Sequence, residues 1–135
     1  IVVLFQSGAD PLKDKEIASL KKATLDGHAG EEETAMIYFI RPDLVDVKAI
    51  GLESGADQAR LKTMPFGYTG IWWYSRYPNH YCGDPVQPDK KLGELLVTKD
   101  ADQLVALIKY LKGNNEIERL QNEFYDRAEA PLKKK

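Results

Sequence analysis

Apolar residues along the chain follow the spacing of several helices and of one short strand. The chain opens with an apolar run, Ile1 to Phe5, which is followed by Ser7 and Gly8. This pattern is typical of a strand buried in a parallel sheet. Such a strand needs neighbours for its backbone hydrogen bonds, and the rest of the chain offers few candidates. We therefore expect part of the sheet to lie in polypeptide that precedes residue 1.

Two helices are predicted in the first part of the chain. The first covers residues 12–25, because Asp10 is a good capping residue, Pro11 suits a first helical turn, and apolar positions then recur at helical spacing. The second covers residues 30–40 and ends before Pro42, since the residue before a proline avoids helical angles. Apolar residues surround this second helix almost completely, so we expect it to be buried on most sides.

The rest of the chain is predicted to combine irregular segments with one extended segment and two further helices. Residues 47–69 carry several glycines and no long period, which indicates an irregular excursion. Residues 70–75 are aromatic and short, and are expected to form a strand or an extended loop, followed by a loop over 76–87. Helices are predicted over 88–112 and 116–128, with their apolar faces turned inward. Together these elements predict an α/β protein in which helices outnumber strands.

Composition and charge restrict the class of protein. Hydrophobic residues make up 43% of the chain and charged residues 30%, which is typical of a folded globular domain, and the net charge of −2 gives no broad positive field for nucleic acid. No apolar stretch approaches the roughly 20 residues that span a bilayer. Cys82 is the single cysteine, which excludes an internal disulfide and fits a reducing compartment. We expect a cytoplasmic protein without nucleic-acid or membrane partners, in which Lys133 to Lys135 form a solvated tail.

The densest group of ionisable residues lies at the start of the second predicted helix. It contains His28 and the successive acids Glu31, Glu32 and Glu33. Acids in a first turn are favoured by the helix dipole, and this is the simplest interpretation of Glu31 and Glu32. Glu33 lies on an apolar face, where a carboxylate must be paired, protonated or bound to a metal, although periodicity alone does not choose it over Glu32. His28 is a candidate acid or base, a candidate metal ligand or a structural histidine.

Aromatic residues form a second group over residues 72–85. Rings concentrated on an irregular segment are typical of a small-molecule pocket or a subunit contact, and one of the two tryptophans could instead fill the core. Cys82 is interpreted as a small buried residue and not as a nucleophile. The candidate substrate-binding residues are Trp72, Trp73, Tyr74 and His80.

These two groups together resemble the creatininase (creatinine amidohydrolase) family. The string from His28 to Thr34, His-Ala-Gly-Glu-Glu-Glu-Thr, and its order relative to a later Gly-Asp-Pro string carry the resemblance, which extends over about residues 1–112. The matching segments are Asp26–Glu31, Glu33-Thr34, Arg41–Val45, His80-Tyr81, Gly83–Pro85 and Lys91–Glu94.

The resemblance implies a three-layer α/β/α sandwich, of which residues 1–135 would be the C-terminal part of a single domain. It also implies a homo-oligomer, usually a hexamer, and two divalent metal ions (Zn, Mn or Fe) that activate a water for attack on a cyclic amide or a related carbonyl. Glu33 matches a metal-binding carboxylate of the family, and His28 matches the catalytic histidine that donates or accepts the proton. Trp72 and Trp73 lie where members of the family shape the substrate pocket.

The chain lacks the family's amino-terminal motifs, a Glu-x-His with a following Asp and an Asn-Gly-His segment, which supply most of the metal ligands. His28 and Glu33 alone could not hold two ions. We therefore expect a hydrolase that acts on a small molecule, such as a cyclic polyol or keto-sugar derivative, only when an N-terminal segment of the same protein completes it. The alternative is a non-catalytic binding or assembly module that keeps the aromatic pocket.

Overall fold

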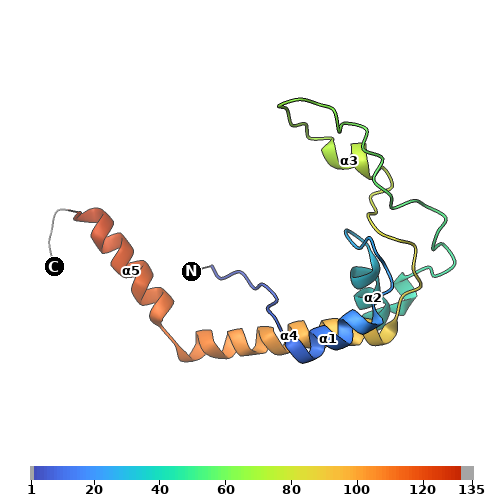
Figure 1. Cartoon of the computed structure of the whole chain (residues 1–135). Helices are drawn as coiled ribbons and strands as arrows, with labels where there is room; N and C mark the ends of the chain where they lie inside the picture. The colour runs from blue at the N-terminus through green and yellow to red at the C-terminus, as the bar shows by residue number, and fades with distance from the viewer. Residues whose placement is uncertain (1, 132–135) are drawn as a thin grey trace. The chain divides into compact units, whose positions relative to one another are not determined.

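The computed structural model describes residues 2–131, which fall into two compact units (Figure 1). One unit comprises residues 9–99, and the described part of the other comprises residues 2–8 and 100–131. The chain's helices are α1 (Pro11–Leu20), α2 (Glu31–Ile40), the 3₁₀ helix η1 (Pro42–Leu44), α3 (Trp72–Arg76), α4 (Lys90–Gly113) and α5 (Glu116–Glu129). Helix α4 begins in the first unit and ends in the second.

The expected α/β/α sandwich is wrong for this chain, because residues 2–131 form helices and irregular segments without a sheet. Extended pairing within this range is limited to an isolated antiparallel bridge between Asp26 and Gly83. The predicted first strand is absent over residues 2–5, where Val2 and Leu4 are 88% and 87% exposed; Ile1 lies outside the described residues. An apolar run forms a strand only where neighbours complete its hydrogen bonds, and the described residues supply none.

Helix α1 starts as predicted and ends earlier. The Asp10 side chain accepts a hydrogen bond from the Lys13 amide, and Pro11 occupies the first turn. The helix stops at Leu20 and not at residue 25, because the next amides are used elsewhere: those of Lys22 and Ala23 donate to the Glu31 carboxylate. A side chain distant in sequence thus determines where the helix ends.

Helices α1, α2 and the first turns of α4 enclose the core of the unit formed by residues 9–99. This core contains Ile17, Ala35, Leu92 and Leu95. Gly93 lets the backbones of α2 and α4 approach closely, since a Cβ at this position would collide with the Ala35 carbonyl. The contact places α2, and with it the glutamates of its first turn, directly on α4.

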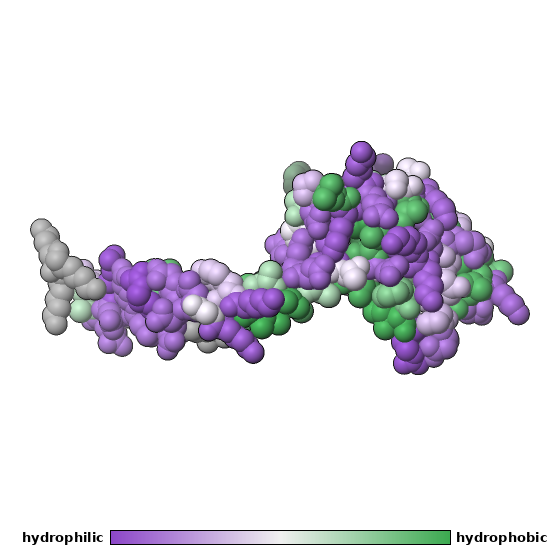
Figure 2. All heavy atoms as spheres, turned by 90° about the horizontal axis from the view of Figure 1, so that it is seen from below, coloured by the Kyte–Doolittle hydropathy of each residue, from purple (hydrophilic) through white to green (hydrophobic). Residues whose placement is uncertain are grey.

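Helix α2 has the predicted bounds but is less buried than expected. Only Glu31 and Ala35 are buried, whereas Ile37 and Ile40 are exposed. Its single buried face accounts for the difference: Ala35 packs on Gly93, and the apolar side chains on the other faces meet no comparable neighbour. Figure 2 shows that apolar side chains reach the surface of the molecule among hydrophilic ones.

The segment predicted to be a strand or an extended loop over residues 70–75 is instead the short helix α3. The Ser75 hydroxyl donates a hydrogen bond to the Trp72 carbonyl within this helix. Residues 47–69 are irregular as predicted, with turns and bends. Arg60 joins this excursion to α3 by donating from Nε to the Ser75 carbonyl at 2.8 Å.

The predicted helices over 88–112 and 116–128 are confirmed as α4 and α5, with a break at Asn114 and Asn115. The expected inward apolar face is present at the start of α4, where Leu92 and Leu95 are buried, and is wrong farther along, where Leu104, Ile108, Leu120 and Phe124 are exposed. None of the helices over residues 2–131 is long and apolar enough to cross a membrane. The predicted tail at residues 133–135 lies outside the described part of the chain.

Candidate functional site

The three glutamates at the start of α2 have different partners. Glu31 is 3% exposed, and its carboxylate accepts hydrogen bonds from the Lys22 and Ala23 amides at 2.9 and 2.8 Å. Glu32 forms an ion pair with Lys21 at 2.5 Å, and this hydrogen bond raises the pKa of Lys21. Glu31 therefore anchors the segment before the helix, and Glu32 neutralises a neighbouring charge.

Glu33 lies beside His28 at the surface. Its Oε2 accepts a hydrogen bond from the Ala29 amide at 2.7 Å and lies 3.6 Å from Nδ1 of His28. The side chains of His28 and Glu33 are 50% and 55% exposed, so the expectation that burial constrains Glu33 is wrong in this chain. Ala29 takes a left-handed conformation, φ 55°, which turns its amide toward the carboxylate. An imidazole and a carboxylate thus stand together, accessible to solvent.

Aromatic rings gather around His28. The His28 ring lies 5.1 Å from His80 and 5.8 Å from Trp73, centroid to centroid, and both contacts are edge-on. Trp73 also packs on Tyr77 at 4.7 Å. Its indole N–H is buried and has no hydrogen-bond acceptor within residues 2–131. Two of the predicted substrate-binding residues, Trp73 and His80, are therefore neighbours of the predicted catalytic histidine.

The other two predicted substrate-binding residues face elsewhere. Trp72 contacts Trp73 edge-on and also contacts Tyr68. It lines a separate cavity of about 420 Å³, which residues within 57–69 of the irregular excursion also line. Tyr74 is exposed, and the Arg60 guanidinium lies over its ring at 5.0 Å. The aromatic residues of 72–85 are therefore divided between the surroundings of His28 and the second cavity, and do not line one common pocket.

Residues 80–84 hold the His28 loop in position. The Gly27 amide donates to the Cys82 carbonyl, and the Cys82 amide donates to the His28 carbonyl, both at 2.9 Å. A side chain at Gly27 would collide with the Cys82 sulfur, so only glycine allows this approach. Asp84 fastens the same loop by accepting hydrogen bonds from the Thr24 and Leu25 amides at 2.7 and 2.8 Å.

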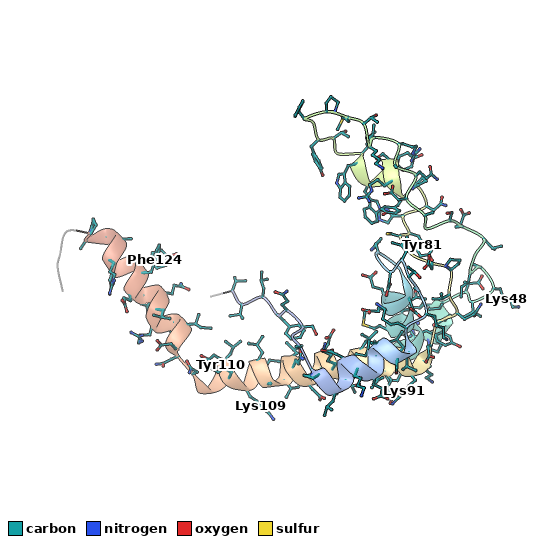
Figure 3. The ribbon with its side chains drawn as sticks, in the orientation of Figure 1. Lys48, Tyr81, Lys91, Lys109, Tyr110 and Phe124 are labelled. Atoms are coloured by element: carbon teal, nitrogen blue, oxygen red, sulfur yellow. The ribbon has the colours of Figure 1, made fainter. Side chains whose placement is uncertain are left out.

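Tyr81, which Figure 3 labels, belongs to the segment that pairs with this loop through Asp26 and Gly83. Its ring packs over Gly55 and Gly83, where a Cβ would collide with it. Burial raises the pKa of the Tyr81 phenol, and the charge of Asp84 adds to the effect. The sequence suggested no specific role for Tyr81 or Asp84, and it indicated for Glu31 only an interaction with the helix dipole. The Gly-Asp-Pro string was the available signal for Asp84.

A cavity of about 500 Å³ opens next to this loop. Glu33 and Thr34 of α2 line one side, and Tyr81 and Asp84 line another. Residues following η1, including Asp46 and Glu53, complete the lining. The cavity is large enough for a small metabolite, and it brings the Glu33 carboxylate to its wall.

The residues of the site fit a metal centre only in part. An imidazole and a carboxylate are ligands that divalent transition metals accept. Within residues 2–131, however, no group of three or more His, Cys, Asp and Glu side chains could hold an ion. His28 and Glu33 could therefore form one edge of a metal site, and this chain's described residues do not form the rest.

Comparison with known proteins shows which family the chain belongs to. The family model for creatininase, described as creatinine amidohydrolase, matches residues 2–108, so the chain belongs to the creatininase family. A solved structure of a putative creatinine amidohydrolase from Bacteroides fragilis is similar in fold, with a TM-score of 0.51 and 21% identity. The similarity covers 70% of this chain and 39% of that one. No curated protein matches the chain.

Proposed function

We propose that this chain supplies part of the active site of a metal-dependent amidohydrolase. The observation that carries the proposal is the pairing of His28 with Glu33, 3.6 Å apart and accessible, within the segment that matches the creatininase family. The chain spans 39% of the similar structure, which leaves room for further ligands on other polypeptide. The N-terminal segment of the same protein, with its Glu-x-His, Asp and Asn-Gly-His motifs, is the proposed source.

The two residues have separate roles in this proposal. A divalent ion lowers the pKa of a bound water and polarises a carbonyl. Glu33, oriented by the Ala29 amide, binds the ion at one edge of the site. His28 carries a proton between solvent and the nitrogen that leaves when the amide bond breaks, a role that its half-exposed imidazole allows.

The proposed substrate is a small cyclic amide or a related carbonyl compound. Glu33 lines the cavity of about 500 Å³, which has the size of a small-molecule site. Trp73 and His80 lie beside His28, and these three residues are outside the lining of that cavity. Creatinine and cyclic polyol or keto-sugar derivatives are the compounds to test first.

The proposal is tested by measuring metal content and turnover together. The chain is co-produced with the proposed N-terminal segment, and bound metal is measured by mass spectrometry of the purified complex. Glu33→Gln should lower bound metal and activity in parallel, whereas His28→Asn should lower turnover about 10²-fold or more and leave the metal in place. Glu32→Gln is the matched control, because Glu32 pairs with Lys21 and should leave the metal unchanged. Unaltered metal content in Glu33→Gln would remove Glu33 from the site.

The same experiment tests the alternative of a non-catalytic binding module. The observation that favours this alternative is the second cavity of about 420 Å³, lined by Trp72 and separate from His28. A complex that binds a cyclic small molecule without turning it over, and whose affinity falls in Trp72→Ala but not in His28→Asn, would support the binding module and contradict the hydrolase.

A further inference from the structure

Helix α5 presents an apolar stripe that the structure leaves open. Ile117, Leu120 and Phe124 follow one another at spacings of three and four residues and therefore share one face. Leu120 and Phe124 are 50% and 65% exposed (Figure 3 labels Phe124). Helix α5 also lies beyond residues 2–108, which match the family model. The stripe is therefore a feature of this chain that the proposed active site does not use.

A helix of this length needs a partner for such a stripe. Helix α5 has 14 residues, and isolated helices of about 12–15 residues are marginal in water even with favourable sequences. Most of the stability of an amphipathic helix comes from packing of its apolar face. Something must therefore cover Leu120 and Phe124 for α5 to be a stable helix in solution.

The charges beside the stripe identify the partner. Four charged residues form a row along one flank of α5: Glu116, Arg119, Glu123 and Arg127. Ion pairs link them within the helix, because Arg119 Nε donates to Glu116 at 2.8 Å, and Arg119 and Arg127 both pair with Glu123. In chain order the signs of this row are negative, positive, negative, positive. Read from the other end, the same row is positive, negative, positive, negative.

Such a row complements itself only in an antiparallel arrangement. When two copies lie antiparallel, the row of one helix faces the same row of the other, and each acid meets a base. In a parallel pair the row of one helix faces the opposite flank of the other helix, so the two rows do not meet. We propose that α5 pairs antiparallel with α5 of a second copy of this chain. The stripes of the two helices bury one another, and the two charged rows determine the orientation of the pair.

The first test is the association state of the full chain by sedimentation equilibrium, over a series from about 1 to 100 μM, the range in which weak pairing is resolved. The wild-type chain should dimerise. Phe124→Glu should raise the dissociation constant about tenfold or more, because it places a charge in the apolar contact. Asn122→Glu, on the same helix with the same change of charge but away from the stripe, should leave dimerisation unchanged. A monomeric wild-type chain at the highest concentration, or equal effects of the two variants, would overturn the proposal.

The second test uses the charged row. Arg119→Glu with Arg127→Glu makes the row entirely negative, and Glu116→Lys with Glu123→Lys makes it entirely positive. Each double variant alone should be monomeric, and an equimolar mixture should form dimers again. Circular dichroism of each double variant checks that its helix content is retained. Retained dimerisation of either double variant alone would show that the row does not take part in pairing, and would overturn the proposed arrangement.

Discussion

Glu31, Glu32 and Glu33 are chemically identical neighbours in the sequence, and the fold gives each a different task. Glu31 is buried among backbone amides, Glu32 is paired with Lys21, and Glu33 stands accessible beside His28. Burial converts the first into a structural residue, because a buried carboxylate persists only where donors surround it. Exposure leaves the third available for chemistry.

Substituting Glu31 should destabilise the chain more than substituting Glu33. Glu31→Gln exchanges a carboxylate that accepts from the Lys22 and Ala23 amides for a neutral group with a donor on one side, at an expected cost of about 1–3 kcal/mol. Glu33→Gln, at a half-exposed position, should change stability by less than about 0.5 kcal/mol. Urea unfolding followed by circular dichroism measures both. Equal losses would mean that the hydrogen bonds of Glu31 contribute nothing specific.

The ion pair between Asp14 and Lys99 should make stability depend on pH at the acidic end. The hydrogen bond from Lys99, 2.6 Å long, lowers the pKa of Asp14 below its unfolded value of 3.8. Its contribution is therefore complete above the unfolded pKa and is lost as the pH falls through the lower, folded pKa. Thermal unfolding between about pH 6 and 2 should lose less stability in Lys99→Met than in the wild type. Parallel pH profiles for the two proteins would contradict this linkage.

At the scale of whole elements, the contact between α2 and α4 depends on one glycine. Gly93→Ala should destabilise the chain by about 1–3 kcal/mol, because the added methyl group collides with the Ala35 carbonyl and Phe39 and outweighs the better helix propensity of alanine. Gly113→Ala, at the other end of the same helix, meets no neighbouring atom and should not destabilise. Melting temperatures of the two variants check the contrast. A stable Gly93→Ala variant would show that the helices separate easily.

Elements whose signals are local could be predicted from the sequence, and those set by distant partners could not. Helix α2 ends before Pro42 and α4 ends at Gly113, as the local residues predict. Helix α1 ends early because Glu31 takes the next amides, and residues 2–5 form no strand because they have no neighbours to pair with. Both outcomes depend on partners outside the segment itself.

The candidate site follows the same division. His28 and Glu33 are five residues apart at a helix start, so their proximity could be predicted. The approach of His80 and Trp73 to His28 depends on the hydrogen bonds that Gly27 and His28 form with Cys82, which no local pattern indicates. Trp72 and Trp73 point to different sites because they are adjacent residues of the helix α3, and adjacent positions on a helix face different directions. The sequence did not predict this, because the aromatic run favoured a strand or an extended loop.

For the molecule as a whole, buried side chains are unevenly divided between the two units. Ile17, Ala35, Leu92 and Leu95 form a core in the unit of residues 9–99, together with buried Tyr77 and Cys82. In the other unit, none of the described residues 2–8 and 100–131 is buried. Helix α4 belongs to both units, so its two ends are stabilised to different degrees.

The two units should therefore unfold in separate steps. Both tryptophans lie in the unit of residues 9–99, so tryptophan fluorescence reports that unit, whereas far-ultraviolet circular dichroism reports all the helices. In urea the circular dichroism signal should begin to fall before the fluorescence changes, because α5 and the end of α4 bury less apolar surface. Leu92→Ala, in the core, should shift the fluorescence transition by about 2–5 kcal/mol, and Leu104→Ala, at an exposed position, should shift it by less than about 1 kcal/mol. Coincident transitions, shifted equally by both variants, would mean that the chain unfolds as one cooperative unit.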